Sequence, residues 1–289
     1  MIMNYMEMLV VALKAALDAG KSIRKVYDGN MEIEEKADGS PLTLADRLAN
    51  GIICKQLETT GIPIISEESQ AIDYNQRKAW SQFWLVDPLD GTKEFISRNG
   101  EFTVNIALIS DGVPVLGVVT APALHQAWFA AEDIAAHQIH DTQLFEEIDK
   151  AHITAESILT HSSKLSSSTP GKQKEVIVSV SRSHLDDKTR ALVRKMSEHD
   201  PNVKMHPKGS SIKFCDLAEG KSVFYPRFTP CYEWDTAAGH AILKASGGEI
   251  ISLESKQALR YNKPELKSPP FIAFRAQEDS KPFMTKFSL

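Results

Sequence analysis

Hydrophobic residues near the start of the chain recur at intervals of three and four, which is the spacing of one helix face. This pattern predicts a helix over residues 6–27 and a second helix that starts near Thr43. Short apolar runs at 62–65 and 83–86 predict buried strands, and the second of them should stop at Asp87-Pro88. The chain is therefore expected to open with helices and to continue into a sheet.

A meander of antiparallel strands should follow. Residues 102–109, 113–120 and 126–131 each read as a strand, and Asp111-Gly112 is a hairpin turn signal between the first two. The pattern is then lost over residues 132–173, which are rich in histidine and serine and include a loop signature at 166–171. We expect a boundary between two domains in this stretch.

Strands and helices alternate in the second half, which predicts an α/β arrangement. The expected strands are 175–180, 222–225 and 249–251, and the expected helices are 185–198, 212–219 and 236–246. We therefore predict an N-terminal α+β domain over 1–135 and a C-terminal α/β domain over 174–289. A loop-rich connection over 136–173 should join them.

Composition narrows the possible functions. The 289 residues carry a formal charge of −5, so no basic excess favours nucleic-acid binding. No apolar run approaches the length of a membrane span. The three cysteines show no paired spacing and fit a reducing compartment. We expect a cytoplasmic protein and leave open both a peripheral position on the inner face of a bacterial membrane and the oligomeric state.

The most informative stretch is Asp87-Pro88-Leu89-Asp90-Gly91-Thr92, where a buried strand meets two carboxylates. Carboxylates bind hard cations, and the amides after a glycine turn can hold an anion. This combination would suit a phosphate held by metal ions. Asp, Pro and Gly are also common turn residues, so a plain turn explains the same letters.

Three other segments carry carboxylates, and each has an ordinary explanation. Glu67, in the SEES segment at 66–69, follows an apolar strand and could lie in a solvated loop. Asp235 could be the N-cap of a helix. Thr43 and Asp46 resemble a capping box, with Asp in place of Glu or Gln. Taken singly, none of these segments specifies a metal site.

Together, the order and wording of these segments resemble the inositol monophosphatase superfamily. The resemblance rests on TLAD at 43–46, SEES at 66–69, DPLDGTKEF at 87–95 and WDTAAGHAIL at 234–243. DGTKEF, together with GSSIKFC at 209–215 and YPRF at 225–228, is most similar to the CysQ-type 3'(2'),5'-bisphosphate nucleotidase branch. The resemblance implies a layered αβαβα sandwich and a lithium-sensitive, Mg²⁺-dependent phosphomonoesterase.

The resemblance also implies roles for individual residues. Two or more Mg²⁺ ions would be held by Glu67, Asp87, the Leu89 carbonyl, Asp90 and Asp235. The amides of Gly91 and Thr92 would bind the scissile phosphate. Asp46 and the Thr92 hydroxyl would orient the attacking water. This role would displace the capping interpretation of Asp46, although a residue at a helix start could serve both.

The implied nucleotide pocket contains His184, Ser210, Lys213 and Arg227. Without the resemblance, Lys213 and Arg227 could be solvated surface charges, and His184 a turn residue. The implied reaction releases the 3'-phosphate of adenosine 3',5'-bisphosphate and leaves AMP, with 3'-phosphoadenylyl sulfate as a further substrate. An inositol monophosphatase and a metal-dependent nucleotide sensor without turnover are the alternatives.

Overall fold

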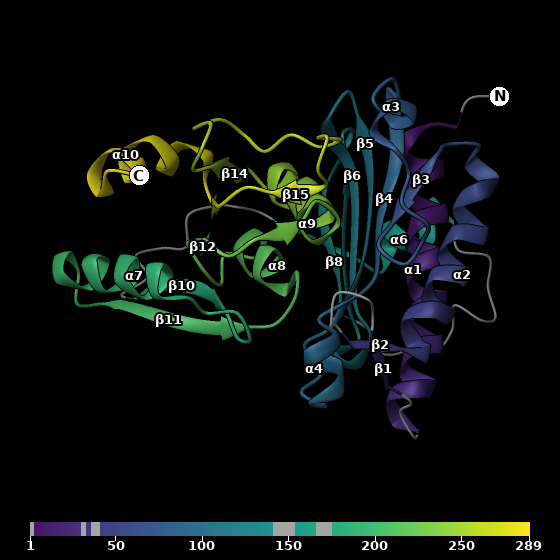
Figure 1. The fold of residues 1–289 in the computed structure, drawn as a ribbon, viewed down its shortest axis with the longest axis horizontal. Coiled ribbons are helices and arrows are strands. Elements are labelled where there is room, and N and C mark those ends of the chain that lie inside the picture. The colour runs from purple at the N-terminus through teal and green to yellow at the C-terminus, as the bar shows by residue number, and fades with distance from the viewer. Residues whose placement is uncertain (1–2, 30–32, 36–40, 141–153, 166–174) are drawn as a thin grey trace.

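Helices and sheets alternate in five layers in the computed structural model, which describes residues 3–29, 33–35, 41–140, 154–165 and 175–289 (Figure 1). Helices α1 and α2 cover one face of a large sheet, and α8 and α9 lie between this sheet and a second one. Helices α7 and α10 cover the far face of the second sheet. The layered αβαβα fold implied by the resemblance is confirmed.

The first sheet has seven strands in the order β3-β4-β5-β6-β7-β8-β9. Strands β3 and β4 are parallel, and every later neighbour is antiparallel. The strands are β3 (Ile64–Ser66), β4 (Gln82–Asp90), β5 (Thr103–Ser110), β6 (Val113–Ala121), β7 (Gln126–Ala131), β8 (Ile134–Ile139) and β9 (Ser163–Lys164).

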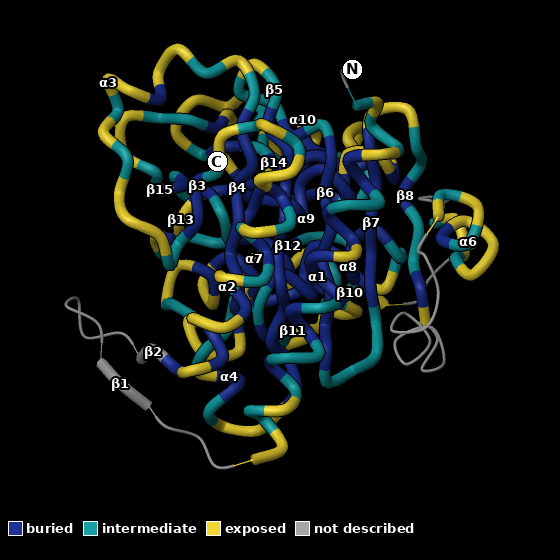
Figure 2. The backbone as a smooth tube through the Cα atoms, turned by 90° about the vertical axis from the view of Figure 1, so that its right-hand side faces the viewer, coloured by how far each residue is buried: buried dark blue, intermediate teal, exposed yellow. Residues whose placement is uncertain are grey.

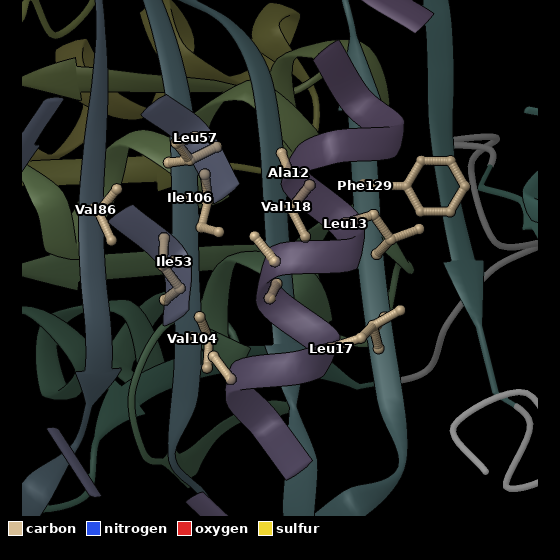
Figure 3. Close-up of a cluster of buried hydrophobic side chains, with 14 of the residues drawn as sticks. Ala12, Leu13, Leu17, Ile53, Leu57, Val86, Val104, Ile106, Val118 and Phe129 are labelled. Carbon is tan, nitrogen blue, oxygen red and sulfur yellow. The ribbon is translucent and has the colours of Figure 1, made fainter. Parts of the chain in front are cut away.

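The outer face of this sheet is covered by α1 (Tyr5–Asp28) and α2 (Leu44–Leu57). A capping box between Asn4 and Glu7 starts α1 and satisfies its first free amides. Figure 3 shows how side chains of both helices point at the strands. The side chains labelled there are Ala12, Leu13, Leu17, Ile53 and Leu57 from the helices and Val86, Val104, Ile106, Val118 and Phe129 from the sheet.

The second sheet has five strands in the order β11-β10-β12-β16-β14. Strand β10 is parallel to β11 and β12, whereas β16 is antiparallel to both of its neighbours. Its strands are β10 (Val176–Ser181), β11 (Val203–Lys208), β12 (Phe224–Arg227), β14 (Glu249–Ser252) and β16 (Phe271–Phe274).

The middle layer consists of α8 (Ile212–Ala218) and α9 (Trp234–Ala245), and both are buried along nearly their whole length. Helix α9 packs so closely on β6 that a Cβ atom on Gly117 would lie 2.3 Å from the Ala238 carbonyl oxygen. On the far side, α7 (Asp187–His199) and α10 (Ser280–Phe287) bury a third apolar cluster. Figure 2 shows the resulting buried centre and exposed rim.

The remaining elements are short and lie at the edges. They are the pair β1 (Ile33–Glu35) and β2 (Pro41–Thr43), the pair β13 (Cys231–Tyr232) and β15 (Lys267–Ser268), and helices α3 (Tyr74–Arg77), α4 (Thr92–Ile96) and α6 (Ala155–Thr160). Within the described ranges, every helix is too short or too polar to cross a bilayer.

Each helix and strand predicted from the sequence is present in the structure, but the prediction was incomplete. Strand β4 was expected to stop at Asp87-Pro88 but continues to Asp90. Strands β8, β11 and β16 and helices α4 and α10 were missed. Because β8 belongs to the first sheet, that sheet continues beyond residue 135, where the first domain was expected to end. The loop signature at 166–171 lies outside the described residues, and the division into domains stays a prediction.

The contact between α9 and β6 gives a testable prediction. We expect Gly117→Ala to lower the free energy of unfolding by about 1–3 kcal/mol, because the added methyl group overpacks a rigid contact. Gly51→Ala is the matched control, since Gly51 is at an exposed position of α2 with no atom within 4 Å of its added Cβ. It should stabilise the protein by roughly 0.5–1 kcal/mol. Urea unfolding of both variants tests this, and equal stability would contradict the close packing.

Candidate active site

Two carboxylates stand at the end of β4, where its pairing with β5 is interrupted. Asp87 lies opposite Asn105 and Asp90 opposite Thr103, and the register shifts between them. Asp87 is 1% exposed, and its Oδ1 accepts a hydrogen bond of 3.1 Å from the Leu89 amide. The expected turn is therefore an irregular strand end that holds both aspartates close together.

Glu67 and Asp46 approach this strand end from neighbouring elements. Because β3 pairs with β4 in parallel, the Glu67 amide donates to the Val86 carbonyl over 3.1 Å, one residue before Asp87. Asp46, in the first turn of α2, accepts from the Thr43 amide at 2.8 Å. The predicted capping box is formed. Capping is thus not displaced by the proposed catalytic role of Asp46.

Asp235 reaches the cluster from the second half of the chain. It is the second residue of α9, so the expectation that it caps this helix is wrong. The Ser211 hydroxyl lies 2.8 Å from the Asp235 carbonyl oxygen and 3.1 Å from Oδ2 of Asp90. It also accepts a hydrogen bond of 2.9 Å from the side-chain amide of Asn105. Ser211 therefore ties Asp90 to the start of α9.

These carboxylates repel one another in a buried setting. Burial raises the pKa of Asp87 well above its ordinary value, and the charges of Glu67, Asp90, Asp235 and Asp46 raise it further. Burial and the charge of Asp90 likewise raise the pKa of Asp235 to about 7. Clustered carboxylate oxygens are the ligands that hard divalent cations prefer.

The donor set thus fits a divalent cation in its chemistry. Among the described residues, however, no three His, Cys, Asp or Glu side chains are gathered as a formed cation site. The carboxylates share a neighbourhood and face one another as like charges.

Gly91 follows the acidic strand end in a conformation that favours glycine. Its φ angle is 88°, and a Cβ atom there would lie 2.1 Å from the Ser210 Oγ. Gly91 precedes α4, which begins at Thr92. The amides expected to hold a phosphate therefore lie beside the carboxylates.

A pocket of about 260 Å³ opens next to this turn. Eight of the twelve residues predicted for the site line it, whereas Asp46, Glu67, Asp87 and Leu89 lie outside its lining. Its walls are formed by Asp90, Gly91, Thr92, Lys93, Glu94, Ser181, His184, Ser210, Lys213, Phe214, Tyr225, Arg227, Asp235, Thr236 and Phe271.

Cationic side chains line the same pocket as the carboxylates Asp90 and Asp235. Lys213 is 2% exposed, so the interpretation of it as a solvated surface charge is wrong. Burial lowers its pKa to about 8, and the nearby Arg227 contributes in the same direction. Arg227 is partly buried and lies within 3.3 Å of the Tyr225 hydroxyl. His184 lies at the rim, with its amide bonded to Ser181.

Ser210 belongs to the pocket wall, but its hydroxyl is engaged elsewhere. It lies 2.8 Å from the Asp90 carbonyl and 2.7 Å from the Glu101 carbonyl. The expected contact of this hydroxyl with substrate would have to compete with these bonds.

Sequence reasoning missed several residues of the pocket. Phe214 lies in the quoted GSSIKFC segment, Tyr225 in YPRF, and Lys93 and Glu94 in DGTKEF. The signal was present in the motifs, but only a three-dimensional structure separates wall residues from their neighbours.

A comparison with protein-family models matches residues 4–274 to the inositol monophosphatase family. Among curated proteins, 3'(2'),5'-bisphosphate nucleotidase CysQ of Salmonella typhimurium is 42% identical over 253 residues. The same enzyme of Escherichia coli K12 is 40% identical. Each match covers 86% of this chain and 92% of the relative.

The solved structures agree with this placement. The crystal structure of CysQ from Bacteroides thetaiotaomicron, described as a bacterial member of the inositol monophosphatase family, is 40% identical with a TM-score of 0.85. The match covers 95% of this chain and 98% of that one. An inositol monophosphatase from Thermotoga maritima matches in fold, with a TM-score of 0.70 at 20% identity over 96% of each chain.

Repulsion in the acidic cluster predicts a pH-dependent effect of Asp235→Asn. Because folding raises the pKa of Asp235, its contribution to stability is present below about pH 4 and is lost as the pH rises through about 7. In EDTA at pH 8 we expect the variant to melt on the order of 5 °C above wild type. At pH 4 the two melting temperatures should converge.

Calorimetric scans at both pH values test this expectation. Asp187→Asn, at an exposed position of α7, is the control. A variant that melts at or below wild type at pH 8 would contradict the repulsion.

Proposed function

The chain belongs to the inositol monophosphatase family, and we propose that it is an Mg²⁺-dependent 3'(2'),5'-bisphosphate nucleotidase. It would remove the 3'-phosphate of adenosine 3',5'-bisphosphate and release AMP and phosphate. The same chemistry would extend to 3'-phosphoadenylyl sulfate. Relatives named as this enzyme share about 40% of its residues, and the pocket described above supports the assignment.

The observation that carries the proposal is the pairing of opposite charges in one pocket. Asp90, Asp235, Lys213 and Arg227 all line it. A substrate with two phosphates would use both kinds of group: one phosphate would meet the acidic cluster through cations, and the other would meet the basic side chains directly. An inositol monophosphate offers nothing to the second group.

In this proposal, Glu67, Asp87, Asp90, Asp235 and the Leu89 carbonyl hold two or more Mg²⁺ ions. Such ions neutralise a phosphate dianion and lower the pKa of a bound water. The amides of Gly91 and Thr92 donate to the scissile phosphate, for which the left-handed Gly91 orients the backbone.

Asp46 and the Thr92 hydroxyl would orient the water in line with the leaving oxygen, and Glu67 would assist. Asp46 is suited to this role because its bonds to Thr43 hold the carboxylate in one orientation. Little covalent chemistry is left to the protein, so most of the rate enhancement would come from positioning and charge.

The distal side of the pocket would bind the phosphate that is not cleaved. Lys213 supplies a point charge, and Arg227 supplies a planar fork that suits phosphate oxygens. His184 at the rim and Ser210 in the wall complete the proposed nucleotide site.

Phosphate release measured with and without Mg²⁺ tests the proposal. We expect rapid release from adenosine 3',5'-bisphosphate with Mg²⁺, none in EDTA, and much slower release from inositol 1-phosphate. Preference for inositol 1-phosphate would instead support the inositol monophosphatase alternative. Tight nucleotide binding without any turnover would support the sensor.

Arg227→Ala should separate substrate binding from chemistry. Losing a charge-assisted hydrogen bond costs about 1.5–3 kcal/mol, so kcat/KM for the bisphosphate should fall roughly 10- to 100-fold, mainly through KM. Slow hydrolysis of a 3'-mononucleotide should change little, because that substrate has no second phosphate. Arg190→Ala, at an exposed position of α7, is the control.

Steady-state kinetics on both substrates decide this point. An equal fall in kcat/KM for the two substrates would show that Arg227 supports the fold or the cation site and does not bind the distal phosphate.

A further inference from the structure

The carboxylate of Glu101 is the centre of a polar cluster beside the pocket. Glu101 is 8% exposed and lies just before β5 of the first sheet. Arg182 donates to it from two nitrogens, Nε at 2.8 Å to Oε2 and Nη2 at 3.0 Å to Oε1. The Gly209 amide donates to Oε2 at 2.8 Å, and Lys208 Nζ lies 3.4 Å from Oε1.

These donors all come from the second sheet. Arg182 directly follows β10, Lys208 ends β11, and Gly209 comes next along the chain. The two strands are parallel neighbours, with Ser181 opposite Lys208. One carboxylate on the first sheet therefore binds the carboxyl ends of two adjacent strands of the second sheet.

The same segment leads into α8 and so to Lys213, one of the cationic residues that line the pocket. Ser210 has a φ of 48°, a left-handed conformation that is unfavourable for a residue with a side chain. Its hydroxyl reaches the Glu101 carbonyl, so both ends of Glu101 hold this loop. Lys213 Nζ in turn donates to the Ser210 carbonyl at 2.5 Å and the Lys208 carbonyl at 3.2 Å. The position of the Lys213 charge thus depends on the loop that Glu101 holds.

The backbone at Gly209 packs tightly against Glu101. A Cβ atom on Gly209 would lie 2.5 Å from the Glu101 carbonyl oxygen. Burial opposes ionisation of Glu101, but its bonds to Arg182 and Gly209 outweigh this and lower its pKa. The carboxylate is therefore charged at neutral pH and keeps its donors in place.

We propose that Glu101 is a positioning residue, which clamps the segment 208–211 to the first sheet and so sets the position of the Lys213 ammonium in the pocket. Neither Glu101 nor Arg182 lines the pocket, so both act through Gly209, Ser210 and Lys213. The inference rests on the proposed function: Glu101 determines the affinity for the phosphate that is not cleaved.

Glu101→Gln tests the clamp because it keeps the size of the side chain and removes its charge. We expect KM for adenosine 3',5'-bisphosphate to rise about tenfold with kcat within about twofold, an effect typical of coupling within one hydrogen-bond network. The kcat/KM for a 3'-mononucleotide should stay unchanged. Amide hydrogen exchange over residues 209–213 should become faster.

Arg182→Met provides a second route if the first variant folds poorly, because the Arg182 side chain is 43% exposed. If both residues act as one clamp, the double variant should have a KM no higher than the worse single variant. Glu175→Gln is the matched control: this glutamate pairs with Lys204 across the same two strands but is 50% exposed. It should change neither KM nor exchange.

Two results would overturn the inference. One is an equal fall in kcat/KM for both substrates, and the other is a lower melting temperature with KM and exchange at 209–213 unchanged. Failure of the proposed function would look different, since wild type would then not hydrolyse the bisphosphate. Hydrogen exchange would still report on the clamp in that case.

Discussion

Electrostatic repulsion among buried carboxylates is the constraint on which the rest of this structure depends. Asp87 is almost fully buried, and the charges of Glu67, Asp90, Asp235 and Asp46 all raise its pKa. Burying like charges together is costly, and such clusters of groups with shifted pKa values are typical of functional sites. The carboxylates destabilise the fold at this point, and the buried apolar clusters on either side of the first sheet stabilise it.

The two halves of the chain contribute different parts of one pocket. The first sheet supplies the acidic end of strand β4, and the second half of the chain supplies Lys213 on α8 and Arg227 on β12. Ser211, Ser210 and Glu101 bridge the two by hydrogen bonds. Carboxylates and cationic side chains are thereby brought into one pocket, which suits a ligand with two anionic groups better than a ligand with one.

The sequence predicted most of the fold, because hydrophobic periodicity reports directly on which face of an element is buried. Helix 6–27 and the meander 102–131 are such cases, and the observed elements agree with them. Strand β11 was missed because four of its six residues are exposed and it shows no clear alternation.

The carboxylates of the candidate site could be predicted, because their motifs occur in a recognisable order along the chain. Its supporting bonds were not: Ser211 and Glu101 act through partners more than 100 positions away in the chain. Lys213 shows the same limit, because nothing in its local sequence distinguishes a buried lysine from a solvated one. Such roles come from packing between sheets, which no local pattern reports.

The most direct test of the account is a crystal structure with Mn²⁺ and AMP, measured at the manganese absorption edge. The account predicts anomalous density among the carboxylates of Glu67, Asp87, Asp90 and Asp235, with the nucleotide phosphate close to Lys213 or Arg227. Manganese bound elsewhere, or a nucleotide outside this pocket, would contradict the central claim. That claim is that the buried carboxylates bind cations and that Lys213 and Arg227 bind phosphate in the same pocket.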